Sequence, residues 1–455
     1  MPTSAVILAA GSGTRMRSAV PKVLHKLAGK PLLEHVINSA QQSGVDQIIV
    51  VTAAERPEVE NNLIDMDSGV RWAIQHEQRG TADAVATALP KLPDDHRALV
   101  IYGDVPLIKS ATLKKLLATP SDSIAWLTAI LPNPHGLGRV VRDNDGNPLA
   151  MVEEKDADDA QKQISEVNSG VCLFPVSFLK KHLPTIDNNN SQKEFYLTDL
   201  FAIAISDHIH LETIVTHDEF EICGVNTREQ LAALERVYQM EQAKKLMQSG
   251  VTLMDPARFD LRGQLTAGKD VTIDINVIVE GRVTIGNNCH IGPNVLLRDV
   301  TIGDDVTILA NCVIEETDID NGCQVGPFAR LRPGTHLHPR AKIGNFVEIK
   351  KSDIGENSKV NHLSYIGDTQ MGNHVNIGAG TITCNYDGAN KHQTIIEDDA
   401  FIGSNNNLVA PVTIEKGATT GSGSTISKNA PKDALTVARA KQVTIKGWRR
   451  PKKDD

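Results

Sequence analysis

The sequence predicts a Rossmann-like α/β domain, followed by a single connector helix and then a parallel β-helix. Three observations support this order. Short apolar runs alternate with helical patterns up to about residue 225, a capped helical segment covers 227–250, and aliphatic residues recur at nearly every sixth position from 273 to 414. We therefore expect one domain at 1–226 and another, with its C-terminal tail, at 251–455, joined by the helix at 227–250.

The first region contains the strand-like runs AVILAA, QIIVVTA, ALVIYGD and IAWLTAIL. Helical patterns lie between these runs, such as GTADAVATALPKL and PLLEHVINSAQQSG, the latter beginning with proline and ending with glycine. This alternation favours a parallel sheet covered by helices. Ligands of such sheets bind at the carboxyl ends of the strands.

The second region reads as one amphipathic helix. Thr227 and Gln230 have the spacing of a capping box, and Gly250 is placed where the helix would stop. A single helix between two larger regions is predicted to act as a connector.

The third region has a six-residue period. Neither an α-helix, with 3.6 residues per turn, nor a strand, with a period of 2, predicts it. A coil with three short sides does, because one inward side chain per side gives about 18 residues per coil and roughly eight coils in all. An ordinary β-sandwich is the alternative, but it would not keep this phase for so long. The 22 positions are Ile273, Val279, Ile285, Ile291, Leu297, Ile302, Ile308, Ile314, Ile319, Val325, Leu331, Leu337, Ile343, Ile349, Ile354, Val360, Ile366, Met371, Ile377, Ile402, Leu408 and Ile414. Ten are followed directly by glycine, which would allow a sharp corner.

Composition limits the classes of partner. The net charge of −9 and the aromatic content of 4% argue against binding to nucleic acid or to an anionic membrane. No apolar run is long enough to cross a membrane and no signal segment is evident, so we expect a cytoplasmic protein. The six cysteines contain no C-x-x-C pair, so their spacing indicates neither a zinc site nor a disulfide framework.

A glycine-containing loop follows the first predicted strand, in VILAAGSGTRM. Gly11 and Gly13 allow a ligand to approach the backbone amides, and Arg15 could contact a phosphate. Met16 stands where both a dinucleotide fingerprint and a Walker loop need glycine, so the pattern alone is also compatible with an ordinary turn. Lys22 adds a second cation, and Asp104 ends another predicted strand, where it could hold Mg²⁺ or simply cap a turn.

These motifs together resemble the nucleotidyltransferases that make nucleotide sugars. Further motifs, in order, are QHEQRGTADA, GLGRV, VEEKDA, EVNSGV and CGVN in the first region, and RLRPG, NFVEIKK, NHLSYIGD, NIGAGTITCNYDG and FIGSN in the third. Over nearly its whole length the sequence therefore resembles the bacterial family of bifunctional N-acetylglucosamine-1-phosphate uridyltransferases and glucosamine-1-phosphate N-acetyltransferases. The resemblance implies a left-handed β-helix, a homotrimer with acetyltransferase sites between neighbouring subunits, and production of UDP-N-acetylglucosamine for peptidoglycan and lipopolysaccharide.

For uridylyl transfer from UTP, the resemblance implies that Arg15 and Lys22 are catalytic and that Asp104 and Asn226 hold Mg²⁺. Attack on the α-phosphorus builds negative charge, so this reaction needs positioning and fixed positive charge more than an acid or a base. Many relatives carry lysine where this chain has Ser12, which removes one cation from the loop. Residues implied to bind UTP or UDP-N-acetylglucosamine are Leu8, Ala9, Ala10, Gly11, Gly13 and Lys22 at the phosphates, Gln75, Gly80 and Thr81 at the uracil, Gly138, Glu153 and Asn168 at the sugar, and Tyr102, Gly103, Asp104 and Asn226.

For acetyl transfer from acetyl-CoA to glucosamine 1-phosphate, the amine must lose a proton as it attacks the thioester. Histidine titrates near neutrality and suits this role as general base. Among 15 histidines the resemblance selects His362, which lies between Val360 and Ile366 of the period and should face outward. It implies that the sugar phosphate is bound by Arg332, Lys350, Tyr365 and Asn376, and acetyl-CoA by Ala379, Asn385, Tyr386, Ser404, Ser422 and Arg439. Relatives usually have alanine at Ser422.

Two other functions are compatible with parts of this pattern. A pyrophosphorylase could carry a β-helix that only oligomerises or regulates, although such a helix would usually be shorter and lack the histidine and the NYDG loop. A nucleotide-sugar-binding scaffold without turnover would need no Mg²⁺. The tail GWRRPKKDD could be disordered or could cap a neighbouring site.

Overall fold

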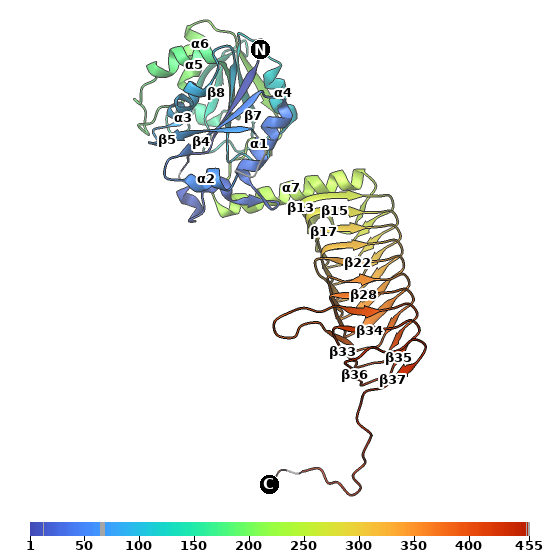
Figure 1. The fold of residues 1–455 in the computed structure, drawn as a ribbon. Coiled ribbons are helices and arrows are strands. Elements are labelled where there is room, and N and C mark those ends of the chain that lie inside the picture. Colours follow the sequence, from blue (N-terminus) through green and yellow to red (C-terminus); the bar gives the residue numbers. More distant parts are fainter. Residues whose placement is uncertain (12, 64–68, 452, 454–455) are drawn as a thin grey trace. The chain divides into compact units, whose positions relative to one another are not determined.

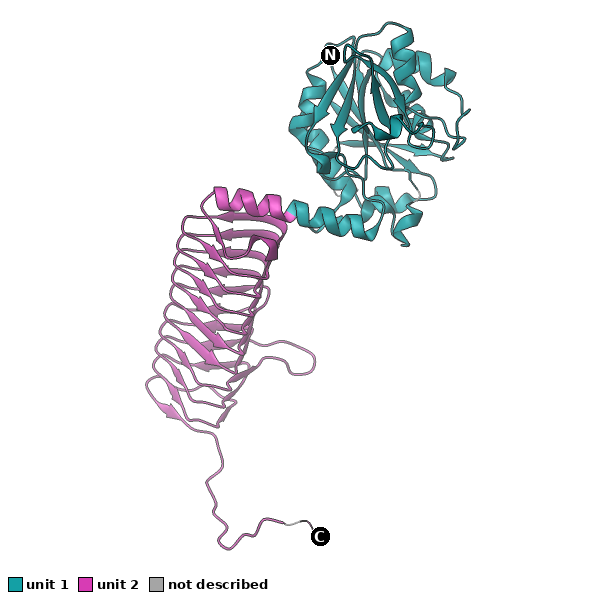
Figure 2. Cartoon of the chain, turned by 180° about the vertical axis from the view of Figure 1, so that it is seen from behind, with its two compact units in different colours: residues 1–238 teal, residues 239–455 magenta. Residues whose placement is uncertain are grey.

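The computed structural model describes residues 1–11, 13–63, 69–451 and 453. The chain divides into two compact units, Met1–Tyr238 and Gln239–Asp455 (Figure 1, Figure 2). No helix in the described part of the chain combines the length and the apolar composition that crossing a membrane requires.

A twisted sheet forms the centre of the N-terminal unit, with the strand order β11-β7-β10-β6-β1-β4-β5 and the β8–β9 pair attached to β10. The four apolar runs of the sequence are β1, β4, β6 and β7, as predicted. The strands are β1 (Thr3–Leu8), β4 (Gln47–Ala53), β5 (Val70–Gln75), β6 (Arg97–Tyr102), β7 (Ile124–Ile130), β8 (Arg139–Arg142), β9 (Pro148–Val152), β10 (Glu166–Pro175) and β11 (Leu211–Thr216), with a separate small pair β2 (Lys26–Leu27) and β3 (Lys30–Pro31).

Helices cover both faces of this sheet and make three layers. Alternate residues of a strand point to opposite faces, so Ile7 packs in one core and Val6 in the other. Helices α1 (Leu32–Ser43) and α4 (Ser110–Leu117) contribute to the first core, together with Val59 of α2 (Pro57–Asn61). The second core contains residues of α3 (Thr81–Ala88), α5 (Val176–His182) and α6 (Asp199–Ser206).

The expectation of a parallel sheet is wrong at β10 and at the attached β8–β9 pair, whose two strands are antiparallel to each other. Strand β10 runs antiparallel to both β6 and β7. The chain reaches β10 from the β8–β9 pair without an intervening α-helix, and antiparallel neighbours need no long crossover. The register of β10 against β7 shifts between Asn168 and Cys172, a bulge of the kind that redirects side chains beside a site.

The predicted connector segment is the helix α7 (Arg228–Gln248). Its capping box is present, because the amide of Gln230 donates to the hydroxyl of Thr227 at 3.2 Å and the amide of Thr227 donates to Gln230 Oε1 at 3.1 Å. Leu234 packs in the N-terminal unit and Leu246 in the C-terminal unit. The division between the units therefore falls inside the helix.

The C-terminal unit is a parallel β-helix with three faces, seen as stacked arrows in Figure 1. Its first face is a sheet of short strands: β12 (Thr252–Leu253), β14 (Thr272–Ile273), β16 (His290–Ile291), β18 (Thr307–Ile308), β20 (Gln324–Val325), β23 (Lys342–Asn345), β26 (Lys359–His362), β29 (Asn376–Ile377), β32 (Phe401–Ile402), β35 (Thr419–Thr420) and β37 (Leu435–Thr436).

The second and third faces share one sheet. Its first four strands cross both faces: β13 (Phe259–Ala267), β15 (Val277–Ile285), β17 (Leu296–Ile302) and β19 (Val313–Ile319). Later coils have separate strands. The second face has β21 (Arg330–Leu331), β24 (Glu348–Lys350), β27 (Tyr365–Gly367), β30 (Ile382–Cys384), β33 (Asn407–Val409) and β36 (Thr425–Ile426), and the third has β22 (Thr335–Leu337), β25 (Asp353–Ile354), β28 (Thr369–Met371), β31 (Thr394–Ile396) and β34 (Val412–Ile414).

All 22 predicted inward positions are at most 3% exposed. Each is stacked on its equivalent in the next coil, as Ile273 is on Ile291 and Ile291 on Ile308. The coil after Ile377 is completed by Thr383 and Ile396, which are buried but were not recognised in the sequence. The loop 385–393 between these two residues interrupts the period and projects from the stack (Figure 1).

The glycines of the period have a different role from the one expected. Of the ten that follow an inward aliphatic residue, Gly326 alone has a positive φ. Many corners are formed instead by non-glycine residues in the left-handed region, often asparagine or aspartate, such as Asn288 with φ 55°. Glycine is needed because the coils approach closely: a Cβ at Gly378 would lie 2.5 Å from the carbonyl carbon of Gly403.

Replacing Ile314 with alanine should lower the free energy of unfolding of the C-terminal unit by about 2–5 kcal/mol, because it leaves a cavity in the stacked core. The adjacent Val313 is 37% exposed, and its replacement with alanine should cost roughly 0.5 kcal/mol or less. Urea unfolding followed by far-UV circular dichroism measures both changes. Equal losses in the two variants would contradict the assigned inward and outward sides.

Candidate active sites

A cavity of about 350 Å³ opens at the carboxyl ends of β1, β5 and β6, beside the N-terminus of α3. This is the position at which an open α/β sheet binds its ligand. Residues around the cavity are Leu8, Ala9, Ala10, Gly11, Lys22, Val23, Gln75, Gln78, Gly80, Thr81, Ala84, Tyr102, Asp104 and Glu194. Ten of them belong to the set that the motifs implied for UTP.

A second cavity of about 170 Å³ adjoins the first, since Thr81, Tyr102 and Glu194 line both. Its other residues are Trp126, Glu153, Asn168, Gly170, Gln192, Tyr196, Leu197 and Thr198. Glu153 and Asn168, the residues implied for the sugar, are thus placed together next to the first cavity.

Two oxygen ligands and two cations meet beside the first cavity. The Lys22 ammonium contacts the carboxylate of Asp104 and donates to Asn226 Oδ1 at 3.1 Å. Arg15 donates to the same Asn226 oxygen at 3.0 Å. Asn226 is far from Asp104 in the chain, but the amide of Val225 donates to the Asp104 carbonyl at 2.9 Å and holds the two segments together.

This cluster fits a divalent cation of the Mg²⁺ type. The Asp104 carboxylate and the Asn226 amide oxygen already share one cation, the Lys22 ammonium. Hard oxygen donors of these two kinds are the ligands that Mg²⁺ prefers, with phosphate oxygens and water completing its shell.

The glycine-containing loop after β1 is held in place by packing at its C-terminal end. Met16 is 2% exposed and packs with Leu27 and Val225 in a small separate core. Gly13 has φ 64°, and a Cβ there would lie 2.7 Å from the Cβ of Lys22, so glycine allows the loop to pass close to that lysine. Ser12, the position at which the sequence departs from many relatives, lies outside the described residues.

The segment 194–198 closes the cavities against α3. A Cβ on Gly80 would lie 2.5 Å from the carbonyl oxygen of Phe195, and the amide of Leu197 donates to the Thr81 hydroxyl at 3.0 Å. Sequence reasoning missed this segment, and with it Glu194, because a loop segment without a glycine pattern carries no distinctive signal.

The second cavity is shaped by a close contact between Tyr102 and Gly170. Gly170 has φ 78°, and a Cβ there would overlap the Tyr102 ring. Asn168 Oδ1 accepts from Trp126 Nε1 at 2.8 Å and from the Gly170 amide at 2.7 Å, which fixes the orientation of its side chain. Burial raises the pKa of Glu153, while the Thr198 hydroxyl, 3.2 Å from Oε1, works in the opposite direction.

Besides Gly13, two glycines of the implied set do not line either cavity. Gly103 lies against Leu8 and Ala9, where a Cβ would come within 3.2–3.3 Å of both. The carbonyl of Gly138 accepts from the Asn168 amide at 2.8 Å, and a Cβ on Gly138 would be 3.3 Å from Glu153 Oε2. Both glycines therefore support residues that do line the cavities.

In the C-terminal unit, residues far apart in sequence form one column at the corner between the first and second faces. Asn345 and His362 are paired by register. The same hydrogen bond then repeats on each coil, from the amides of Gly380, Asn405 and Gly423 to the carbonyls of His362, Ala379 and Ser404. Arg439 Nη1 reaches the carbonyl of Ser422, the next member, at 2.6 Å. The column contains Asn345, His362, Ala379, Ser404 and Ser422.

His362 is exposed, and its Nδ1 lies 2.6 Å from Asn345 Oδ1. The amide oxygen of asparagine can only accept, so this contact is a hydrogen bond when the ring proton is on Nδ1, the tautomer that leaves Nε2 with a lone pair. Sequence reasoning did not single out Asn345, although it occurs in the motif NFVEIKK.

A group of cations lies on the second face. Lys350 stacks one coil after Arg332, since Leu331 is in register with Ile349. Lys391, from the inserted loop, is the main cause that lowers the pKa of Lys350. Like charges this close favour an anionic ligand. Lys391 was not predicted from the sequence, because a lysine in a projecting loop is usually an ordinary solvated charge.

Of the other residues that the resemblance implies for acetyl transfer, some lie near these cations and one does not. The Tyr365 hydroxyl and the Asn385 amide both lie beside Gly367, where a Cβ would collide with them. Tyr386 is 60% exposed on the inserted loop, its hydroxyl donating to the Gly388 carbonyl at 2.6 Å. Asn376 does not join them: it lies on β29 of the first face.

Comparison with known proteins agrees with this architecture. Residues 5–154 match the family described as MobA-like NTP transferase domain. Residues 268–299 match bacterial transferase hexapeptide (six repeats), and residues 393–428 match hexapeptide repeat of succinyl-transferase. These matches identify the β-helix as the left-handed hexapeptide type.

Two curated relatives match the chain almost from end to end, and both are named Bifunctional protein GlmU. The protein from Marinobacter nauticus is 52% identical over 453 residues, covering 99% of each chain. The protein from Alkalilimnicola ehrlichii is 50% identical over 448 residues, covering 98% of this chain and 96% of its own.

The fold and the two sites define a bifunctional transferase, in which a nucleotidyltransferase domain is joined to a hexapeptide-repeat acyltransferase. The chain belongs to the family of bifunctional GlmU proteins, which carry uridyltransferase and acetyltransferase roles. Its substrates are small molecules, and its nucleotidyl transfer is a metal-dependent reaction.

Replacing Gly170 with alanine should lower the kcat/KM of uridylyl transfer by at least about tenfold, because the new Cβ would push Tyr102 into the cavities. Gly146→Ala is the matched control: its φ of 83° gives the same backbone strain, but nothing lies within 4 Å of its Cβ. Steady-state kinetics of both variants measures the effect. The contact with Tyr102 would be irrelevant if the two variants lost activity equally.

Proposed function

We propose that this chain makes UDP-N-acetylglucosamine in two steps. The C-terminal unit transfers an acetyl group from acetyl-CoA to glucosamine 1-phosphate, and the N-terminal unit transfers uridylyl from UTP to the resulting N-acetylglucosamine 1-phosphate, releasing pyrophosphate. The contact of His362 with Asn345 is the observation that carries the proposal. It supports a general base on the β-helix, which a β-helix used only for oligomerisation would not need.

In uridylyl transfer, the phosphate oxygen of the sugar attacks the α-phosphorus of UTP. Arg15 and Lys22 follow the glycine-containing loop after β1. They supply fixed positive charge for the negative charge that accumulates on the phosphates during attack. Gln75 is buried, and its Nε2 donates to Asp83 Oδ2 at 2.7 Å, so its side chain is held in place for the uracil. Glu153 and Asn168 orient the acetylated sugar in the adjoining cavity.

Asp104 and Asn226 would hold Mg²⁺, which when bound neutralises phosphate charge. Lys22 contacts both of these oxygens in the structure. We propose that Lys22 exchanges these contacts for phosphate oxygens when the nucleotide binds. The oxygen ligands would then hold the metal ion in place of the ammonium, and the charge of Lys22 would lie on the substrate phosphates.

In acetyl transfer, Nε2 of His362 accepts a proton from the amine of glucosamine 1-phosphate as the nitrogen attacks the thioester carbonyl. A C–N bond forms, the C–S bond breaks, and coenzyme A leaves as a thiol(ate). Arg332, Lys350 and Lys391 bind the sugar phosphate, with Tyr365 beside them. The column continues from His362 through Ala379, Ser404 and Ser422, with Arg439 bonded to Ser422, and we propose that these residues bind acetyl-CoA. Asn385 and Tyr386 would contact the same ligand from the inserted loop.

Asn376 supports a site made by more than one chain. It belongs to the set implied for the sugar phosphate but lies on a different face from Lys350. Hexapeptide-repeat proteins commonly oligomerise, and we propose a homotrimer in which a neighbouring copy supplies Asn376.

The cytoplasmic location stays a prediction from the sequence.

The two reactions should be separable by mutation. His362→Ala should lower acetyl transfer by about 10²- to 10⁴-fold and leave uridylyl transfer unchanged. Asp104→Ala should abolish uridylyl transfer and spare acetyl transfer. The measurement supplies [14C]acetyl-CoA with glucosamine 1-phosphate, and separately UTP and Mg²⁺ with N-acetylglucosamine 1-phosphate. Loss of both activities in either variant, or of neither, would defeat the assignment, and activity without added Mg²⁺ would contradict the metal site.

Asn345 should act as a positioning residue for His362. Asn345→Ala should lower the kcat of acetyl transfer while leaving the KM for both substrates nearly unchanged, because the imidazole loses its fixed tautomer. Asn345→Asp should restore much of the rate, since a carboxylate also accepts from Nδ1–H. If the aspartate variant were as slow as the alanine variant, or if KM rose in step, the role would be structural.

A further inference from the structure

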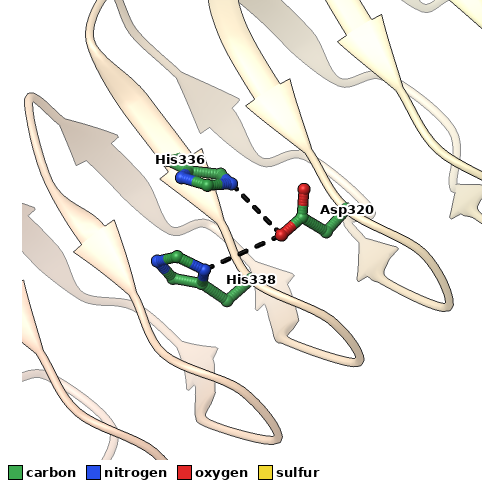
Figure 3. A group of neighbouring side chains, drawn as sticks. All are labelled: Asp320, His336 and His338. Atoms are coloured by element: carbon green, nitrogen blue, oxygen red, sulfur yellow. Dashed lines mark ion pairs between the residues drawn. The ribbon is translucent and has the colours of Figure 1, made fainter.

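A cluster of two histidines and one aspartate lies on the third face of the β-helix, outside both sites described above. It consists of Asp320, His336 and His338, with one ligand atom of each lying within 4.8 Å of the others (Figure 3). We propose that this cluster binds a divalent transition-metal ion, with Zn²⁺ as the best match, and that the ion links two neighbouring coils.

The strand geometry makes the cluster. Leu337 points inward and is fully buried, so His336 and His338, on either side of it, point outward from the same face. Ile319 is in register with Leu337 on the preceding coil, which places Asp320 opposite His338. Parallel strands are about 4.8 Å apart, so all three side chains reach a common point.

The distances suit a shared ion. Asp320 Oδ2 lies 3.2 Å from His336 Nε2 and 3.7 Å from His338 Nδ1, drawn as dashed lines in Figure 3. Ligands about 2.0–2.1 Å from one tetrahedral Zn²⁺ are separated by roughly 3.3 Å, so small side-chain rotations would complete the geometry. The side chains are 35–38% exposed, which allows an ion to enter and water to take the fourth position.

The surroundings favour the same ion. Asp353 Oδ1, from the following coil, lies 3.9 Å from His336 Nδ1, on the side of the ring that faces away from Asp320. A carboxylate there can hold the ligating imidazole in orientation, as partners of zinc-bound histidines usually do. Asp318, in register with His336, adds further negative charge to the face.

The donor set also predicts selectivity. Two imidazoles with one carboxylate suit Zn²⁺ or Co²⁺, whereas Mg²⁺ prefers oxygen ligands alone. The cluster should therefore not compete with Asp104 for Mg²⁺. None of the six cysteines contributes a ligand, which is why the cysteine spacing gave no sign of this site.

Binding should link Asp320 on one coil to both histidines on the next. In a repeat fold each coil contacts only its neighbours, so such a link acts directly on the interface between coils. Because the ion binds the folded face and not the extended chain in this geometry, it should raise the melting temperature of the protein.

The test uses the full chain, titrated with Zn²⁺ alone by equilibrium dialysis. The wild type should bind one more equivalent than His336→Gln, His338→Gln and Asp320→Asn, or bind that equivalent at least about tenfold more tightly. His290→Gln is the matched control, since His290 is also an exposed histidine of the β-helix, on its first face. It should bind as the wild type does. Comparing variants cancels any Zn²⁺ bound elsewhere on the chain.

Two further measurements complete the test. Co²⁺ should give visible ligand-field bands of low-symmetry coordination in the wild type and the His290→Gln variant and weaker bands in the other three. Zn²⁺ should raise the melting temperature of the wild type and the His290→Gln variant, but not that of the other three variants. Assays of both enzymatic activities check that each variant is folded. Equal Zn²⁺ binding by the wild type and all four variants, or loss of binding in His290→Gln as well, would overturn the proposal.

Discussion

Stacking of inward-facing aliphatic side chains is the constraint on which the C-terminal unit depends. Ile273, Ile291 and Ile308 lie on one another because each coil repeats the register of its predecessor. The same repeat aligns the outward side chains, which have no packing requirement of their own. The column that contains Asn345 and His362, and the pairing of Asp320 with His338, both follow from this alignment. The positions of these outward side chains are therefore set by a buried core that does not contact a ligand.

Most of the fold could be predicted from the sequence where a period or a cap is visible. Each of the 22 positions selected by the six-residue period is buried, and Thr227 with Gln230 located the start of α7. Prediction failed where another interaction decides the outcome. Thr383 fills an inward position with a polar residue, so an aliphatic period cannot find it. The direction of β10 depends on the β8–β9 pair, a tertiary arrangement that local patterns do not encode.

The candidate sites were predicted less completely, because a motif identifies residues and not their neighbours. The glycine loop, Lys22 and Asp104 carry a recognisable pattern, and the structure brings them together. Glu194, Asn345 and Lys391 carry no pattern, and only the folded chain reveals their contacts. His336 and His338 did have a usable signal: two histidines on either side of an inward leucine must face the same way.

The loop 385–393 shows how this architecture tolerates change in chain length. Val360 is in register with Ile377, and Ile377 in turn with Ile402, so the coil that carries the loop is longer than the coil before it. The additional residues leave and re-enter the stack at one corner, and every later coil keeps its alignment. Coil length also differs by one residue elsewhere in the stack, since Ile291 follows Ile273 by 18 residues and Ile308 follows Ile291 by 17, with the register kept. Evolution or an engineer can thus lengthen, shorten or exchange the loop 385–393 while the inward residues on either side of it stay aligned.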